Sequence, residues 1–139
     1  MLNRKIDSYL KDYYQKSSNA LLITGARQVG KTYSIREFGK TFKSFIEINF
    51  IENPDVVGLF KDAKGSADIL MRLSTITNMP MIKGDTLIFF DEVQECPDIV
   101  TAIKFLVDEG SYRYILSSSL LGVELKDIRS VPVGYMGVK

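Results

Sequence analysis

An eight-residue run with two glycines, a lysine and a threonine constrains this chain more than any other feature. Residues 25–32 read Gly-Ala-Arg-Gln-Val-Gly-Lys-Thr and match the pattern G-x-x-x-x-G-K-[ST] at every fixed position. Gly25 and Gly30 allow the backbone to turn tightly and to approach an anion without a Cβ in the way. We therefore expect this run to cradle phosphate groups with backbone amides at the start of a helix.

The positions of the run have different expected roles. The amides from Gln28 to Lys31 are expected to point into one concavity, and Lys31 supplies a point charge to the β- and γ-phosphates. The hydroxyl of Thr32 is the expected ligand for Mg²⁺. We expect the side chain of Arg27 to point away from the phosphates and to form a structural ion pair. The predicted nucleotide-binding residues are Gly25, Ala26, Arg27, Gln28, Val29, Gly30, Lys31, Thr32 and Tyr33.

The flanking sequence supports this interpretation. Residues 20–24 are a short apolar run that is typical of a buried parallel strand. Residues 33–40 carry Ile35 and Phe38 at helical spacing. The order strand, loop and helix is the context that a phosphate-binding loop needs. The alternative is a glycine-rich turn before an ordinary helix.

Composition limits the number of domains, the types of catalysis and the location that this chain can have. A chain of 139 residues with a net charge of +1 predicts one domain, here residues 1–139, without a strong electrostatic attraction to nucleic acid. It contains no histidine, which excludes imidazole catalysis and histidine metal ligands. The single cysteine, Cys96, is expected to be a plain thiol. Since we find neither a signal peptide nor an apolar run long enough for a membrane span, we expect a cytoplasmic protein.

The order of the elements predicts an α/β fold with a mostly parallel sheet. Residues 1–16 form an amphipathic helix, and a short helix follows the segment Asn53-Pro54-Asp55. We expect further helices at residues 33–40, 67–76 and 97–109 and strands at residues 20–24, 43–50, 86–90 and 112–117. Ligands bind such sheets beyond the carboxyl ends of the strands, where three polar segments converge.

Two of these polar segments lie far from the loop in sequence. Residues 87–90 are apolar and are followed by Asp91 and Glu92. We expect Asp91 to act on Mg²⁺ and Glu92 to orient the attacking water. Residues 117–119 are three serines, of which Ser117 and Ser119 are the preferred candidates for contact with the γ-phosphate or the water; strand-end turns favour serine in any case. For Gln94 we expect a solvated position, with contact to water or a partner as the alternative.

Together these segments resemble the AAA-like predicted ATPases of bacteria and archaea. The resemblance rests on Gly-Ala-Arg-Gln-Val-Gly-Lys-Thr, on Phe-Phe-Asp-Glu-Val-Gln at residues 89–94, on residues 116–122 and on residues 129–135. It implies a three-layer α/β/α P-loop NTPase domain of the additional-strand, catalytic-glutamate type. It also implies ATP rather than GTP as the nucleotide, with Mg²⁺.

Two features depart from that family. Its members usually carry Ser-Gly-Ser where this chain has three serines, so Ser118 would strain the turn if glycine were needed there for positive φ or close approach. Family chains also continue into a lid and a nuclease-like domain, so we interpret this chain as a fragment or a truncated form. Arg113 and Arg129 are candidates for an arginine finger that acts on a neighbouring subunit, with surface ion pairs as the alternative.

The sequence thus favours an ATP-binding domain that hydrolyses ATP with Mg²⁺. The predicted catalytic residues are Lys31, Glu92, Ser117 and Ser119, and the predicted metal ligands are Thr32 and Asp91. A nucleotide-dependent switch or binding module with negligible turnover is the alternative. A phosphotransferase is disfavoured because no lid with phosphate-clamping arginines is visible. The expected partners are ATP and ADP, with a homo-oligomer as a further possibility and no membrane or nucleic acid indicated.

Overall fold

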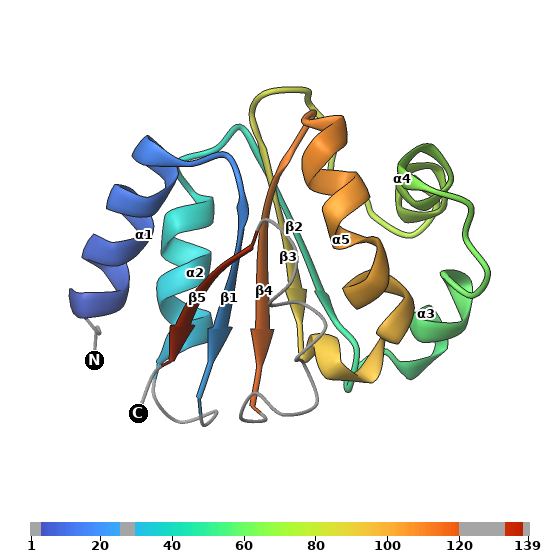
Figure 1. The fold of residues 1–139 in the computed structure, drawn as a ribbon, viewed down its shortest axis with the longest axis horizontal. Coiled ribbons are helices and arrows are strands. Elements are labelled where there is room, and N and C mark those ends of the chain that lie inside the picture. The colour runs from blue at the N-terminus through green and yellow to red at the C-terminus, as the bar shows by residue number, and fades with distance from the viewer. Residues whose placement is uncertain (1–3, 26–29, 120–132, 138–139) are drawn as a thin grey trace.

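Five parallel strands form the centre of the molecule. The computed structural model describes residues 4–25, 30–119 and 133–137. Its strands are β1 (Ala20–Thr24), β2 (Ser44–Asn49), β3 (Thr86–Asp91), β4 (Arg113–Ser118) and β5 (Val133–Gly137). They pair in the order β2-β3-β4-β1-β5, and every neighbouring pair is parallel (Figure 1). The insertion of β4 between β1 and β3 is the additional strand that the family resemblance implied.

Helices cover both faces of this sheet and produce three layers. The helices α1 (Arg4–Lys16) and α2 (Lys31–Gly39) pack on one face. The helices α3 (Pro54–Leu59), α4 (Ser66–Ser74) and α5 (Pro97–Glu109) pack on the other (Figure 1). A short 3-10 helix, η2 (Val93–Glu95), joins β3 to α5. The α/β/α prediction is therefore confirmed.

The alternation of side chains along the strands creates a core on each face of the sheet. In β3 the two sets are Leu87 with Phe89 and Ile88 with Phe90, all fully buried. A central parallel strand is covered on both faces, which explains its unbroken apolar sequence. In β2 the burial alternates along the strand, as expected for the outermost strand of the sheet. The core on the α1 and α2 side consists of Ile6, Leu10, Leu21, Ile23, Ile35, Leu87, Phe89 and Ile115.

Helix α1 is fastened to the sheet through Arg113. The guanidinium of Arg113 donates hydrogen bonds to the backbone oxygens of Tyr14 and Ser17 at 2.6 and 2.7 Å and lies over the Tyr14 ring. The Tyr14 hydroxyl donates in turn to the backbone oxygen of Tyr114. Arg113 begins β4, so it lies at the sheet edge opposite the carboxyl ends. In place of a surface ion pair, Arg113 thus binds backbone oxygens of its own chain, and its role as an arginine finger stays a prediction. Arg129 lies outside the described residues.

Two elements were not predicted. Strand β5 contains Gly134 and Gly137 within five residues, and glycine is depleted in strands, so its sequence carries no strand pattern. Its pairing with β1 nevertheless places it at the edge of the sheet. The segment that forms the 3-10 helix η2 was also not assigned to a helix from the sequence. Cys96, which follows η2, is buried, and burial raises the pKa of its thiol to about 11, in agreement with a plain thiol.

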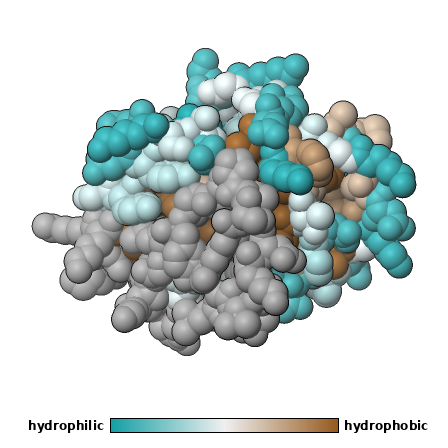
Figure 2. Space-filling view, in the orientation of Figure 1, coloured by the Kyte–Doolittle hydropathy of each residue, from teal (hydrophilic) through white to brown (hydrophobic). Residues whose placement is uncertain are grey.

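The described surface is mixed in character. Figure 2 shows hydrophilic residues at the periphery of one face and hydrophobic residues between them nearer its middle. Within the described residues, the helices are too short or too polar to pass through a membrane.

Packing between α2 and β2 gives a direct test of this architecture. A Cβ added to Gly39 would lie 2.4 Å from Cδ1 of Phe45, whereas a Cβ on Gly58 in α3 would meet nothing within 4 Å. We expect Gly39→Ala to lower the free energy of unfolding by about 1–3 kcal/mol because it overpacks the contact between helix and strand. The matched variant Gly58→Ala is expected to raise it by about 0.5–1 kcal/mol, since alanine favours a helix. Urea denaturation of both variants checks this, and an unchanged midpoint for Gly39→Ala would contradict the packing.

Candidate functional site

The two ends of the glycine run have the backbone conformation that the sequence requires. Gly25 has φ of 147° and Gly30 has φ of 79°, both in the region that favours glycine. Gly30 precedes the first residue of α2, so the run leads from β1 directly into a helix N-terminus. Residues 26–29, which include the predicted Ala26, Arg27, Gln28 and Val29, lie outside the described residues. The two ends therefore fix where the loop begins and ends.

Lys31 is a buried cation between two strands. Its side chain is 1% exposed, and its Nζ donates hydrogen bonds to the backbone oxygens of Gly25 and Ser118, both at 2.8 Å. The amide of Gly25 also donates to the Ser118 oxygen at 3.1 Å. The carboxyl end of β4 thus holds both the start of the run and the amine of Lys31. The amine of Lys31 is thereby placed at the carboxyl edge of the sheet.

Thr32 and Tyr33 follow Lys31 in the first turn of α2. Thr32 is partly exposed, and the side chain of Tyr33 is 50% exposed. Both are consequently accessible to a ligand at the start of the helix.

Asp91 ends β3 and is held from both neighbouring strands. Its Oδ1 accepts a hydrogen bond from Ser117 Oγ at 2.5 Å, and its Oδ2 accepts one from Asn49 Nδ2 at 3.1 Å. Burial raises the pKa of Asp91, while the bond from Ser117 opposes this shift. Sequence reasoning missed Asn49. Its position at the end of the second predicted strand was the available signal, because parallel strands end at the same edge.

Glu92 has an unusual backbone and a fully engaged carboxylate oxygen. Its φ of 56° and ψ of 50° lie in the left-handed region, which for a residue other than glycine costs on the order of 1–3 kcal/mol. Its Oε1 accepts hydrogen bonds from Gln94 Nε2 at 3.0 Å and from the amide and hydroxyl of Ser119 at 3.1 and 2.9 Å. Burial acts to raise the pKa of Glu92, but these hydrogen bonds together lower it below its usual value. The carboxylate is held ionised.

The three serines at residues 117–119 form hydrogen bonds with the other residues of the site. Ser117 contacts Asp91, the backbone of Ser118 contacts Lys31, and Ser119 contacts Glu92. Ser118 belongs to β4 and lacks the positive φ that a glycine requirement would have produced. Glycine is therefore not needed at this position for a positive φ, and a need for close approach stays a prediction. The expectation of a solvated Gln94 is wrong, since its side chain is partly buried against Glu92.

The donor set fits a magnesium–nucleotide complex better than a metal bound by protein alone. Among the described residues no three His, Cys, Asp or Glu side chains come together to hold a metal ion. Mg²⁺ usually takes one or two protein ligands and completes its shell with water and substrate phosphates. The Asp91 carboxylate and the Thr32 hydroxyl are oxygen donors of the kind it prefers, at the same edge as the buried amine of Lys31.

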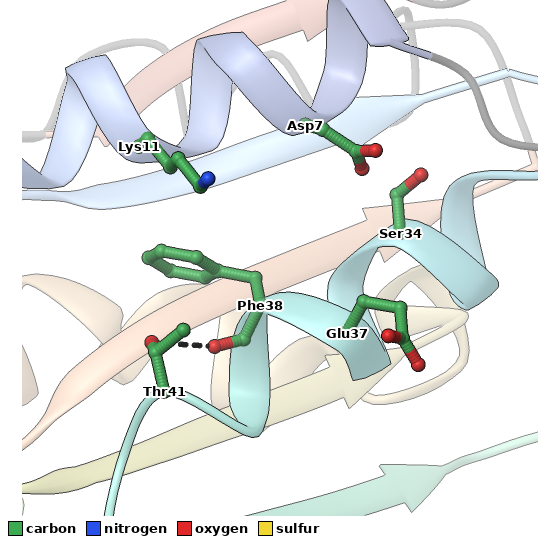
Figure 3. Close-up of a pocket in the computed structure, with 6 residues that line it drawn as sticks. All are labelled: Asp7, Lys11, Ser34, Glu37, Phe38 and Thr41. Carbon is green, nitrogen blue, oxygen red and sulfur yellow. Dashed lines mark hydrogen bonds between the residues drawn. The ribbon is translucent and has the colours of Figure 1, made fainter.

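A separate hollow of about 230 Å³ lies between α1 and α2. Figure 3 shows Asp7 of α1 and Ser34 of α2 pointing into the space between the helices. The Ser34 hydroxyl is buried and has no hydrogen-bond partner in the described ranges of the chain. The described residues that line this hollow include neither Lys31 nor Asp91, so it is distinct from the edge where the strands end.

Comparison with known proteins assigns the class. The family model described as an AAA domain matches residues 17–139, and the chain therefore belongs to this family of AAA-like ATPase domains. No curated protein sequence matches it. The structural neighbours are P-loop ATPases, which agrees with the resemblance seen in the sequence.

Three solved structures illustrate the shared fold. The Walker-type ATPase of Pyrococcus abyssi has a TM-score of 0.62 and 16% identity, with 100% of this chain and 54% of that chain covered. The Aeropyrum pernix ORC1 protein, solved in complex with DNA, has a TM-score of 0.61 and 15% identity, with 98% and 44% covered. The DnaC helicase loader has a TM-score of 0.52 and 13% identity, with 98% and 87% covered. This chain spans about half the length of the first two.

Asn49 allows a test of how the site is assembled. Its Oδ1 accepts hydrogen bonds from the amides of Ile51 and Glu52, both at 2.9 Å, while its Nδ2 donates to Asp91. We expect Asn49→Ala to lower the free energy of unfolding by about 1–3 kcal/mol, because these partners lose their hydrogen bonds.

Asn49→Asp serves as the matched variant for that test. It keeps an acceptor for the two amides but places a second carboxylate against Asp91. Two adjacent carboxylates repel each other at pH 7 and can share a proton at lower pH. As the pH falls from 7 to 5, the free energy of unfolding of Asn49→Asp should therefore rise relative to that of Asn49→Ala. Urea denaturation at both pH values measures it. A stability for Asn49→Ala equal to that of the wild type would contradict the assembly.

Proposed function

We propose that this chain binds ATP with Mg²⁺ at the carboxyl edge of its sheet and hydrolyses the γ-phosphate. The observation that carries the proposal is the convergence of the buried amine of Lys31 with the carboxylates of Asp91 and Glu92, all held by the end of β4. A positive centre for phosphate, an oxygen donor for a cation and a carboxylate for water are the parts that phosphoryl transfer needs.

In this proposal the glycine run and the first turn of α2 bind the phosphates. The proposed nucleotide-binding residues are Gly25, Ala26, Arg27, Gln28, Val29, Gly30, Lys31, Thr32 and Tyr33. In the described structure Lys31 is held by two carbonyl oxygens, so its charge is in place before a ligand arrives. Phosphate oxygens would replace these neutral acceptors with charged ones, which strengthens the hydrogen bonds of an ammonium group.

Asp91 and Thr32 are the proposed ligands of the metal, directly or through water. Bound Mg²⁺ would neutralise charge on the β- and γ-phosphate oxygens. Ser117 and Asn49 keep the Asp91 carboxylate directed along the edge.

Glu92 is the proposed residue for the attacking water. It orients the water, whose oxygen forms a bond to the γ-phosphorus while the bond from that phosphorus to the bridging oxygen breaks. The proton released by the water passes to the Glu92 carboxylate and then to solvent, and the products are ADP and inorganic phosphate. Ser119, which contacts Glu92 in the structure, is proposed to reach the γ-phosphate or the water, and Ser117 to support Asp91.

A second candidate function is a nucleotide-dependent switch with negligible turnover. It is favoured by the engagement of Glu92 Oε1 with three hydrogen-bond donors, because the two donors of Ser119 must move away if that oxygen is to meet water. In either case we propose a cytoplasmic, single nucleotide-binding domain over residues 1–139 that can form a homo-oligomer.

Replacement of Glu92 by glutamine separates binding from turnover. Glutamine keeps the size and an acceptor oxygen but cannot take the proton, so Glu92→Gln should lower phosphate release by at least about 100-fold. Binding of Mg·ATP, measured by isothermal titration, should persist. Wild-type turnover that survives in Glu92→Gln would contradict the role of Glu92. A wild-type chain that binds ATP without releasing phosphate would instead favour the switch.

A further inference from the structure

We propose that Gln94 is a positioning residue that sets the orientation of the Glu92 carboxylate toward the reacting phosphate. This inference rests on the proposed hydrolysis of ATP and adds a residue to it. It is carried by the contact of Gln94 Nε2 with Glu92 Oε1 at 3.0 Å and by the rigid turn that holds both residues.

The turn after β3 fixes where these two side chains lie. Glu92 has a left-handed backbone, and η2 follows immediately, closed by hydrogen bonds from the Glu95 amide to the Glu92 oxygen at 3.1 Å and from the Cys96 amide to the Val93 oxygen at 2.9 Å. Val93 and Cys96 are both fully buried in the core on the α5 side. Because Val93 and Cys96, on either side of Gln94, are anchored in this core, Gln94 is held in place facing Glu92.

The orientation of the Gln94 amide follows from its partner. With the amide reversed, its oxygen would face the Glu92 carboxylate oxygen and repel it, so the nitrogen must point to Glu92. The Gln94 Oε1 is then buried and has no hydrogen-bond partner within the described part of the chain. A buried acceptor without a donor opposes folding. Stability of the fold therefore does not explain a glutamine at this position, whereas its contact with Glu92 does.

Gln94 and Ser119 donate hydrogen bonds to the same oxygen, Glu92 Oε1, from two different parts of the fold. Ser119 follows β4 and Gln94 belongs to η2, and together they donate three hydrogen bonds to Glu92 Oε1. If Ser119 turns toward a bound nucleotide, Gln94 is the donor that stays attached to the same rigid turn as Glu92. Its contact then keeps the carboxylate in the orientation that meets the water.

The test compares Gln94→Met with the matched variant Gln15→Met, which makes the same change on the exposed face of α1. Each protein is assayed for single-turnover phosphate release, for the Kd of Mg·ATP and for its thermal midpoint. Gln94→Met should slow the chemical step by about 10- to 100-fold because the carboxylate loses its alignment. The Kd should change by less than about twofold, and the midpoint should not fall, since the unpaired buried acceptor is removed.

A double variant shows whether Gln94 acts through Glu92. In a Glu92→Gln background, Gln94→Met should cause no further slowing beyond about twofold, because residues that act as a unit are not additive. An unchanged rate in Gln94→Met would overturn the inference, as would parallel losses of rate, affinity and midpoint. If the wild-type and Gln15→Met proteins bind ATP but release no phosphate, the proposed hydrolysis itself fails and Gln94 has no reaction for which to position Glu92.

Discussion

The buried ammonium group of Lys31 is the interaction on which the proposed site depends. It joins the start of the glycine run to the end of β4 through two carbonyl oxygens, and the same β4 oxygen also accepts the amide of Gly25. This arrangement is possible only because β4 lies between β1 and β3. Because β4 separates β1 from β3, its serines lie between the glycine run and the acidic pair. If β3 paired directly with β1, these serines could not contact both Lys31 and the two carboxylates.

The site also illustrates how a fold can hold polar groups that do not favour its stability. Asp91 is buried with a raised pKa, Glu92 has a left-handed backbone, and the Gln94 carbonyl oxygen is buried without a partner among the residues that the structure describes. Each of these features opposes folding, and all three lie within four consecutive residues after an entirely apolar strand segment. The apolar cores on both faces of β3 supply the stability that compensates for them.

Much of this architecture could be read from the sequence because its signals are local. The apolar strands, the helical spacing of Ile99, Ile103 and Leu106 and the glycine run each depend on neighbours in the chain. Strand β5 escaped prediction because its sequence is short and rich in glycine, and only its pairing with β1 makes it a strand. The roles of Asn49, Gln94 and Arg113 depend on partners brought together by the sheet and by the turn after β3. Asn49 had a signal in the sequence, its position at the end of a predicted strand, whereas no spacing rule predicts the contacts of Gln94 and Arg113.

Thermal unfolding with and without Mg·ATP, for the wild type and for Lys31→Ala, tests the central claim of nucleotide binding most directly. Circular dichroism of both proteins first establishes that the variant is folded. At about 100 times the Kd, ligand binding should stabilise the wild type by roughly 2.7 kcal/mol, which raises the midpoint by several degrees. We predict this rise in the wild type and its loss in Lys31→Ala. The absence of any rise at millimolar nucleotide, or an equal rise in both proteins, would contradict the account.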